Sequence, residues 1–173
     1  MKFQKLLIAV TMLLFMQPMF AQKTKDSWVK WKHLCGSWIG AENGQPGQGT
    51  GAFTFQSDLD SNILVRKSST TFPASKSRPA FTHNDLLIVY RDTSRNPTKA
   101  IYFDNENHVL NYNITYNDSS IVMTSEILPN LSQFRLSYVT LSSKKVNVKF
   151  EIALPPDHSK FMIYLEGKAL KKD

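Results

Sequence analysis

Cysteine is almost absent from this chain, which restricts what can stabilise the fold. The 173 residues include one cysteine, Cys35, so no internal disulfide can form. Its neighbours, Leu34 and Gly36, are typical of a cysteine that packs as a small apolar residue. Stability must therefore come from a hydrophobic core, and the length is typical of one domain that can bury a full core.

Several patterns of catalytic residues are also missing. The sequence has no Gly-x-Ser-x-Gly motif and no His-x-His or HExxH spacing, which argues against the common hydrolase and zinc-enzyme arrangements. His33 lies only two residues before Cys35 in a segment predicted to be helical, where side chains two positions apart diverge. We therefore expect no cysteine–histidine pair, no metal site and no cofactor.

A concentrated basic patch is lacking as well. The formal net charge is +7, but the basic residues are scattered except at Lys168, Lys171 and Lys172. Nucleic-acid binding requires lysines and arginines gathered on one face, so we expect no nucleic-acid partner. The sequence gives no indication of the oligomeric state.

The first residues resemble a secretory signal peptide. Lys2 and Lys5 precede an apolar run over residues 6–15, and Pro18 comes just before the small residue Ala21; this is the charged, apolar and cleavage-site order of such a peptide. The run is too short for a membrane span, which needs roughly 20 apolar residues. We expect a signal peptide over residues 1–21, a single mature domain over residues 22–173, no membrane span, and export to the periplasm or the extracellular space.

The pattern after the first residues of the mature chain favours β-structure. Helical spacing of Trp28, Trp31 and Leu34 predicts one short helix over residues 25–34. After it, short runs rich in Val, Ile, Thr, Phe and Tyr alternate with turn residues, as in an antiparallel sheet. The predicted strands are Ser37–Ala41, Gly49–Gln56, Asn62–Ser69, Asp85–Arg91, Lys99–Asp104, His108–Tyr116, Ile121–Glu126, Gln133–Leu141, Lys145–Leu154 and Phe161–Ala169.

Short connections between these strands indicate how the sheet is arranged. No second helix interrupts the series, so a parallel α/β sheet is excluded. An up-and-down sheet of this size removes its exposed edges by closing on itself. We therefore predict an all-β fold, an antiparallel up-and-down β-barrel of eight to ten strands with a short N-terminal helix. The stretch over residues 70–84, with Pro73 and Pro79, is predicted to be a loop over the barrel mouth.

A family resemblance follows from the residues Leu34-Cys35-Gly36-Ser37-Trp38-Ile39-Gly40. The Gly-x-Trp at the start of the first strand resembles the entry of the calycins, which include the lipocalins, and Gly-x-Trp-x-Gly resembles the nitrobindin-type barrels. Glycine allows a sharp bend there, and the tryptophan plugs the closed end. Residues 78–86, 99–105 and 108–112 are similar to segments of lipocalin-like exported proteins of Bacteroidetes-type bacteria. The resemblance implies a barrel fold and an exported location, but no particular ligand.

Two departures from these families bear on function. Calycins commonly place an arginine of the last strand against the tryptophan, whereas residues 167–171 here are Gly-Lys-Ala-Leu-Lys, so a lysine must substitute or the contact is absent. Nitrobindins bind haem through a histidine in the C-terminal half. The histidine deep in that half, His158, follows Pro155-Pro156-Asp157 in a predicted loop, so the resemblance does not extend to a haem site.

Candidate acid–base residues cluster near one predicted hairpin. Asp104 and His108 flank a tight turn, and His83 lies two residues before Asp85. A histidine beside a carboxylate can act as a general base or a metal ligand. The alternative is that Asp104 caps the turn and the histidines pack at strand ends. The sequence does not decide whether these residues converge.

Aromatic residues spread over many strands suggest a partly apolar interior. Most of them are expected to be core, but a minority could line a cavity with an arginine as polar anchor. The candidate ligand-binding residues are Trp38, Arg66, Tyr90, Tyr102, Tyr112, Arg135 and Tyr138.

Three hypotheses for function follow. The first is an exported lipocalin-like carrier or sensor of a small apolar or amphipathic molecule, for which an acid head would suit the arginine. The second is a barrel enzyme, an isomerase, cyclase or hydrolase, using His83, Asp104 or His108 as acid or base. The third is a filled barrel that serves as an envelope interaction module. Fold alone cannot separate them.

Overall fold

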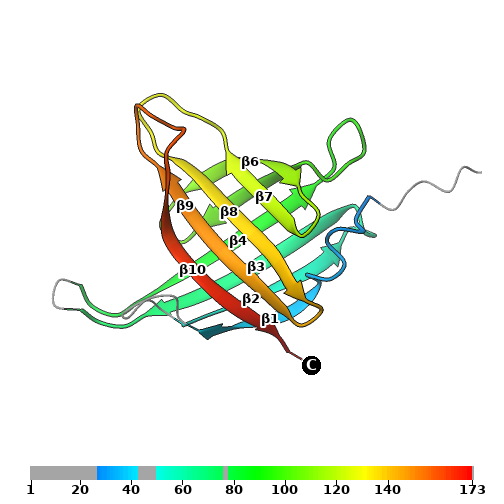
Figure 1. The fold of residues 1–173 in the computed structure, drawn as a ribbon, viewed down its shortest axis with the longest axis horizontal. Helices are drawn as coiled ribbons and strands as arrows, with labels where there is room; N and C mark the ends of the chain where they lie inside the picture. Colours follow the sequence, from blue (N-terminus) through cyan, green and yellow to red (C-terminus); the bar gives the residue numbers. More distant parts are fainter. Residues whose placement is uncertain (1–26, 43–49, 76–77, 173) are drawn as a thin grey trace, which may run out of the picture.

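A computed structural model describes residues 27–42, 50–75 and 78–172 of the chain. They form a closed antiparallel barrel in which each strand pairs with its neighbours in sequence, and β1 pairs with β10 to complete the ring (Figure 1). The all-β, up-and-down barrel prediction is confirmed, at ten strands. Their bounds are β1 Gly36–Glu42, β2 Thr50–Asp58, β3 Ile63–Phe72, β4 Phe81–Tyr90, β5 Lys99–Asp104, β6 Val109–Tyr116, β7 Ser120–Ser125, β8 Gln133–Ser142, β9 Lys145–Ala153 and β10 Phe161–Lys171.

Alternation of side chains fixes which face of each strand is inside. In β2, Phe53 and Phe55 are buried while Thr54 and Gln56 are exposed. Successive side chains of a strand point to opposite faces, so one residue of slippage would bring the polar set inside.

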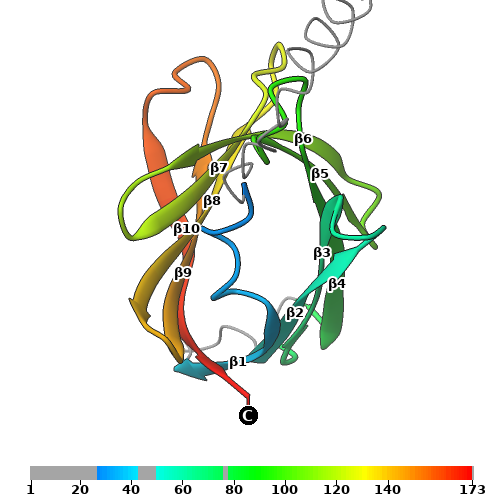
Figure 2. The same cartoon turned by 90° about the vertical axis from the view of Figure 1, so that its right-hand side faces the viewer.

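One end of the barrel is closed by the segment before β1. Residues 27–34 form consecutive turns, in which the amide of Trp31 donates to the Trp28 carbonyl and that of Leu34 to the Trp31 carbonyl. Trp31 and Leu34 are fully buried, and the Trp31 indole donates a 2.9 Å hydrogen bond to the Tyr116 hydroxyl. Figure 2 shows this segment, in blue, lying across the ring of strands.

The predicted helix over residues 25–34 is thus represented by turns over its described part. Each of these hydrogen bonds joins residues three apart, which is tighter than the four-residue spacing of an α-helix. Residues 25 and 26, like the predicted signal peptide over residues 1–21, lie outside the described residues. Among the residues that are described, no helix is long and apolar enough to cross a membrane.

Trp38 in the first strand contacts Lys171 in the last strand, where the barrel closes. They are partners in the β1–β10 pairing, and the Lys171 ammonium lies 5.5 Å from the centre of the Trp38 ring. The ammonium also donates a 2.9 Å hydrogen bond to the His33 carbonyl, and the Trp38 indole donates one of 2.8 Å to the Leu34 carbonyl. Of the alternatives left open by the sequence, the structure shows the first, in which a lysine takes the place of the arginine.

Aromatic side chains fill the half of the barrel next to this closed end. Trp38 stacks on Phe53 with ring centres 6.0 Å apart, and Phe53 and Phe55 meet Tyr138 edge-on at 5.6 and 5.4 Å. Such tilted and offset ring pairs contribute about 0.5–1.5 kcal/mol each beyond the area they bury. Because this half of the barrel is filled, any site inside the barrel must lie above the aromatic core.

The loop predicted over residues 70–84 is shorter than expected. β3 continues to Phe72 and β4 starts at Phe81, so Thr70 to Phe72 pair with Phe81 to His83. The rings of Phe72 and Phe81 stack at 4.7 Å. The β-branched and aromatic residues at both ends of this stretch favour strand, and only 73–80 connects them. The resulting hairpin projects beyond the neighbouring strands instead of folding over the mouth (Figure 1).

Candidate ligand-binding cavity

The barrel interior contains a cavity of about 350 Å³ above the aromatic core. It opens at the end that carries the β5–β6, β7–β8 and β9–β10 connections, opposite the end closed by residues 27–34. This volume lies at the lower end of the range of small-molecule sites, roughly 300–1,000 Å³. The lining residues are Arg66, Ser68, Thr70, Phe72, His83, Asp85, Tyr102, Asp104, Glu106, His108, Leu110, Tyr112, Phe134, Leu136, Val148, Phe150, Ile152, Tyr164 and Leu165.

One side of the cavity, which we name the apolar wall, comes from β6, β8, β9 and β10. The rings of Phe134 and Phe150 stack in parallel at 5.9 Å, and Tyr164 meets Phe150 edge-on at 6.1 Å. The wall comprises Leu110, Phe134, Leu136, Val148, Phe150, Ile152, Tyr164 and Leu165. It offers apolar surface that a ligand body can cover, gaining about 25 cal/mol per Å² removed from water.

The opposite side, the polar wall, comes from β3, β4, β5, the β5–β6 turn and Tyr112 of β6. At its deepest point the Arg66 guanidinium donates a 2.8 Å hydrogen bond to Asp85, and both side chains are less than 10% exposed. Arg66 lies 5.7 Å above the Phe53 ring. The pair therefore sits where the cavity meets the aromatic core, and each charge requires the other there.

Two buried polar atoms beside this ion pair have no partner among the described residues. They are Nε of Arg66 and the hydroxyl of Tyr138. Burial raises the pKa of Tyr138 to about 12, although the neighbouring guanidinium acts in the opposite direction. Burial also raises the pKa values of Tyr102 and Tyr112. All three phenols therefore stay protonated at neutral pH and can donate hydrogen bonds.

A chain of hydrogen bonds runs along the polar wall toward the mouth. His83 Nδ1 is 2.8 Å from Glu106 Oε1, and His83 Nε2 is 3.0 Å from the Tyr102 hydroxyl. That hydroxyl is also 3.2 Å from Asp104 Oδ2. It has one proton, so it donates either to a neutral His83 or, when the ring carries both protons, to Asp104.

Asp104 ends this chain and holds the β5–β6 turn. Its Oδ1 accepts 2.9 Å hydrogen bonds from the amides of Glu106 and His108, and Oδ2 lies 2.8 Å from His108 Nδ1. Burial alone would raise the pKa of Asp104, but these hydrogen bonds lower it. The carboxylate therefore stays ionised, and both sequence interpretations of Asp104, turn cap and partner of a histidine, describe its contacts.

The structure brings most of the predicted site residues together. His83, Asp104, His108, Arg66, Tyr102 and Tyr112 all line the cavity. Tyr102 and Tyr112 meet edge-on at 6.3 Å. Trp38 and Tyr138 lie in the aromatic core below the cavity floor and do not line it.

Two predicted ligand-binding residues lie on the outside instead. Tyr90 alternates with the buried residues Leu87 and Val89 and is 37% exposed. Arg135 faces outward, makes two 2.8 Å hydrogen bonds to Glu151 and lies 3.9 Å above the Phe161 ring. Neither residue lines the cavity, because the alternation of its strand directs it away from the interior.

Several lining residues were not among the predicted site residues. Ser68 and Thr70 follow Arg66 at two-residue spacing in β3, so the alternation of that strand places them on the same inward face as Arg66. Glu106 lies in the turn, where spacing carries no such information. His158, which the sequence comparison with haem-binding barrels pointed to, donates a 2.9 Å hydrogen bond from Nε2 to the Leu131 carbonyl between two loops and does not line the cavity.

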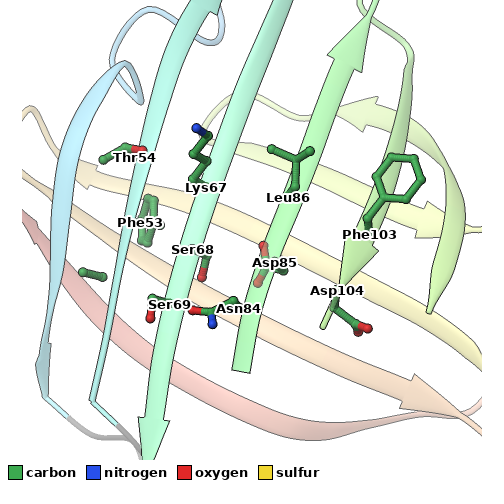
Figure 3. Close-up of a pocket in the computed structure, with 11 residues that line it drawn as sticks. Phe53, Thr54, Lys67, Ser68, Ser69, Asn84, Asp85, Leu86, Phe103 and Asp104 are labelled. Carbon is green, nitrogen blue, oxygen red and sulfur yellow. The ribbon is translucent and has the colours of Figure 1, made fainter. Parts of the chain in front are cut away.

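A second concavity of about 650 Å³ lies across strands β2 to β5 (Figure 3). Lys67, Leu86 and Phe103 are on the outer face there, while Ser68 and Asp85 point into the barrel and border both spaces. This groove is broad and open, and the surface that its residues turn toward it is mostly apolar. The cavity inside the barrel, which gathers the titratable residues, is the better candidate for a site.

Comparisons with known proteins add no relative. No family model matches the sequence, and no curated protein is significantly similar to it. Within residues 27–42, 50–75 and 78–172, no group of three or more His, Cys, Asp or Glu side chains is placed to hold a metal ion.

Proposed function

We propose that this chain is an exported, lipocalin-like protein that binds one small amphipathic molecule inside its barrel. The observation that carries the proposal is the two-sided cavity, in which an apolar wall faces a polar wall. Pockets that combine apolar surface with a few converging polar groups are the usual form of small-molecule sites.

The closed end supports the calycin part of the proposal. Gly36 has a φ of 114°, a conformation that glycine adopts readily and other residues rarely do. It turns the chain from the closing segment, residues 27–34, into β1, and Trp38 follows as part of the aromatic core. Lys171 supplies the cation that calycins take from an arginine. Export and the division into residues 1–21 and 22–173 rest on the order of charged, apolar and small residues at the start of the sequence.

A fluorescent-probe titration with two matched variants tests the site. N-phenyl-1-naphthylamine is uncharged and gains fluorescence in apolar surroundings. Leu110 lines the cavity, whereas its neighbour Val109 is 59% exposed on the outer face. We expect the wild-type protein and Val109→Trp to bind the probe, and Leu110→Trp to bind it at least tenfold more weakly. Equal binding by the two variants would place the probe outside the barrel and contradict the proposal.

A second candidate function, acid–base catalysis, is favoured by the environment of His83. Glu106 on Nδ1 and Tyr102 on Nε2 orient the ring, and Nε2 is 3.9 Å from Asp85 Oδ2. A histidine oriented by a carboxylate on one nitrogen is a common general base. In a carrier, the same contacts would only fix the polar wall.

Native mass spectrometry and chromatography of co-purifying molecules separate these two functions. A carrier yields the same compound from wild type and His83→Gln. An enzyme yields different compounds, because the variant retains substrate that the wild type converts. The third hypothesis, a filled barrel, has less support, since the open half of the barrel encloses about 350 Å³.

A further inference from the structure

We infer that the cavity selects an uncharged amphiphile, with a hydroxyl or carbonyl head group, over a carboxylate or an amine of the same size. This inference rests on the proposed ligand-binding function and deepens it by naming the class of ligand. It also differs from the acid-headed ligand that the sequence suggested. The charges of the polar wall carry the argument.

Arg66, the one arginine or lysine that lines the cavity within the described residues, is already neutralised. Asp85 lies 2.8 Å away, and the two side chains are 8% and 6% exposed. Nε of the guanidinium is buried and Nη1 is bonded to Asp85, so a ligand carboxylate would have to share this guanidinium with the aspartate. An anionic head at Arg66 would stand beside Asp85 and meet like-charge repulsion at low solvent exposure.

Further negative charge lies along the same wall. Asp104 and Glu106 add two carboxylates between the floor and the mouth, next to His83 and His108. The wall therefore carries three carboxylates, those of Asp85, Asp104 and Glu106, and one guanidinium. A ligand carboxylate entering the cavity would leave water for a wall of its own sign, which makes its desolvation costly.

A cationic head gains little from these carboxylates. Both oxygens of Asp104 already have partners, since Oδ1 accepts hydrogen bonds from the amides of Glu106 and His108 and Oδ2 lies 2.8 Å from His108 Nδ1 and 3.2 Å from the Tyr102 hydroxyl. Glu106 is bound to His83 and is 50% exposed, so an ion pair with it would be screened by solvent. Deeper in the cavity, an ammonium group would approach Arg66 and be repelled.

An uncharged head avoids both costs. Ser68, Thr70 and Tyr112 bring hydroxyl groups to the polar wall, and burial keeps the Tyr112 phenol protonated by raising its pKa. A ligand hydroxyl or carbonyl can exchange hydrogen bonds with such groups without changing any charge. The apolar body then lies against Phe134 and Phe150.

Displacement of N-phenyl-1-naphthylamine by 1-octanol, octanoate and octylamine at pH 7.5 tests the inference. These probes share one hydrocarbon chain and differ in head-group charge. We expect 1-octanol to displace the dye at a concentration at least tenfold lower than either charged probe. Equal or tighter binding of octanoate or octylamine would overturn the inference while leaving a ligand-binding barrel intact. Failure of 1-octanol to displace a dye that does bind inside the barrel would overturn it as well.

An Asp85→Asn variant provides an independent measurement. Removing this carboxylate leaves Arg66 without its counter-charge, so octanoate should gain at least tenfold in affinity while 1-octanol changes little. Circular dichroism and the dye titration establish that the variant is folded. If the folded variant gains no affinity for octanoate, Arg66 does not govern charge selection and the inference fails. If the wild-type protein does not bind the dye at all, that result contradicts the proposed function itself.

Discussion

The ammonium nitrogen of Lys171 lies 5.5 Å from the ring centre of Trp38 and 2.9 Å from the carbonyl oxygen of His33. One cation thus connects the last strand with the first strand and with the segment that closes the barrel. Both contacts are electrostatic, and both are partly shielded from solvent.

We expect Lys171→Met to lower the free energy of unfolding by about 1–3 kcal/mol, because it removes a charge-assisted hydrogen bond and a cation–π contact. The exposed neighbour Lys172 makes a suitable control, and Lys172→Met should change stability by less than about 0.5 kcal/mol. Urea unfolding measures both. Equal effects of the two substitutions would show that the Trp38 contact contributes nothing to stability.

The buried ion pair beneath the cavity should be costly to break from one side. Arg66→Met leaves Asp85 buried without a counter-charge, which destabilises proteins by about 3–5 kcal/mol. The double variant Arg66→Met, Asp85→Leu should recover most of this loss, since neither charge remains. Urea unfolding of both single variants and the double variant gives the coupling energy. The exposed pair Lys160–Asp157 is the control, with an expected coupling of about 0–1 kcal/mol.

His33 should make stability depend on pH near neutrality. Its Nε2 lies 2.6 Å from the Thr140 hydroxyl, and burial, with a smaller contribution from Lys171, lowers its pKa below the ordinary 6.5. The unfolded chain therefore binds the proton at higher pH than the folded chain, so stability falls as pH drops below about 6.5.

Chemical unfolding of wild type and His33→Gln between pH 8 and pH 5 measures this effect. The variant should lose less stability over this range than wild type does. The other histidines are the same in both proteins, so the difference between the two curves reports His33. Parallel curves would mean that protonation of His33 does not destabilise the segment over residues 27–34 that closes the barrel.

Asp104 should contribute to stability only while it is ionised. Its pKa is lowered in the folded state, so its contribution is complete above about pH 4, the usual range of an aspartate in the unfolded chain, and is lost as pH falls through the folded value. Asp104→Asn should therefore be less stable at pH 7 and lose less stability on acidification. Asp104→Asn curves that lie parallel to wild type from pH 7 to pH 2.5 would contradict this role.

The sequence predicts the sheet well because alternation is a local property. Val146, Val148 and Phe150 point inward as expected, and the observed strand bounds differ from the predicted ones by a few residues at most positions. The largest difference is at residues 70–84, where Pro73 and Pro79 suggested a long loop. The pairing of Thr70 with His83 depends on a partner strand, which local propensity does not include.

The register between strands decides which side chains line the cavity, and therefore which of the predicted site residues lie there. Asp85 pairs with Asp104 across β4 and β5, which brings His83 to Glu106, but no feature of either segment alone specifies that pairing. Tyr90 was misplaced because residues 86–89, Leu-Leu-Ile-Val, are apolar on both faces and hide which set is inside. Arg135 was chosen for its charge, although Phe134 and Leu136 on either side show the inward alternation.

The pairing of β1 with β10 has a consequence for how the chain acquires its structure. Every other strand pair in the described ring joins neighbours in sequence and can form as a hairpin as soon as both strands are available. β1 must wait for the last strand to be synthesised, so until then a growing sheet keeps two unpaired edges, which favour association with other chains. The ring therefore closes last, at the point where Trp38 meets Lys171. A circularly permuted chain that joins these ends and opens at another turn would turn the β1–β10 pairing into a hairpin, and the last closure would move to the two strands beside the new opening.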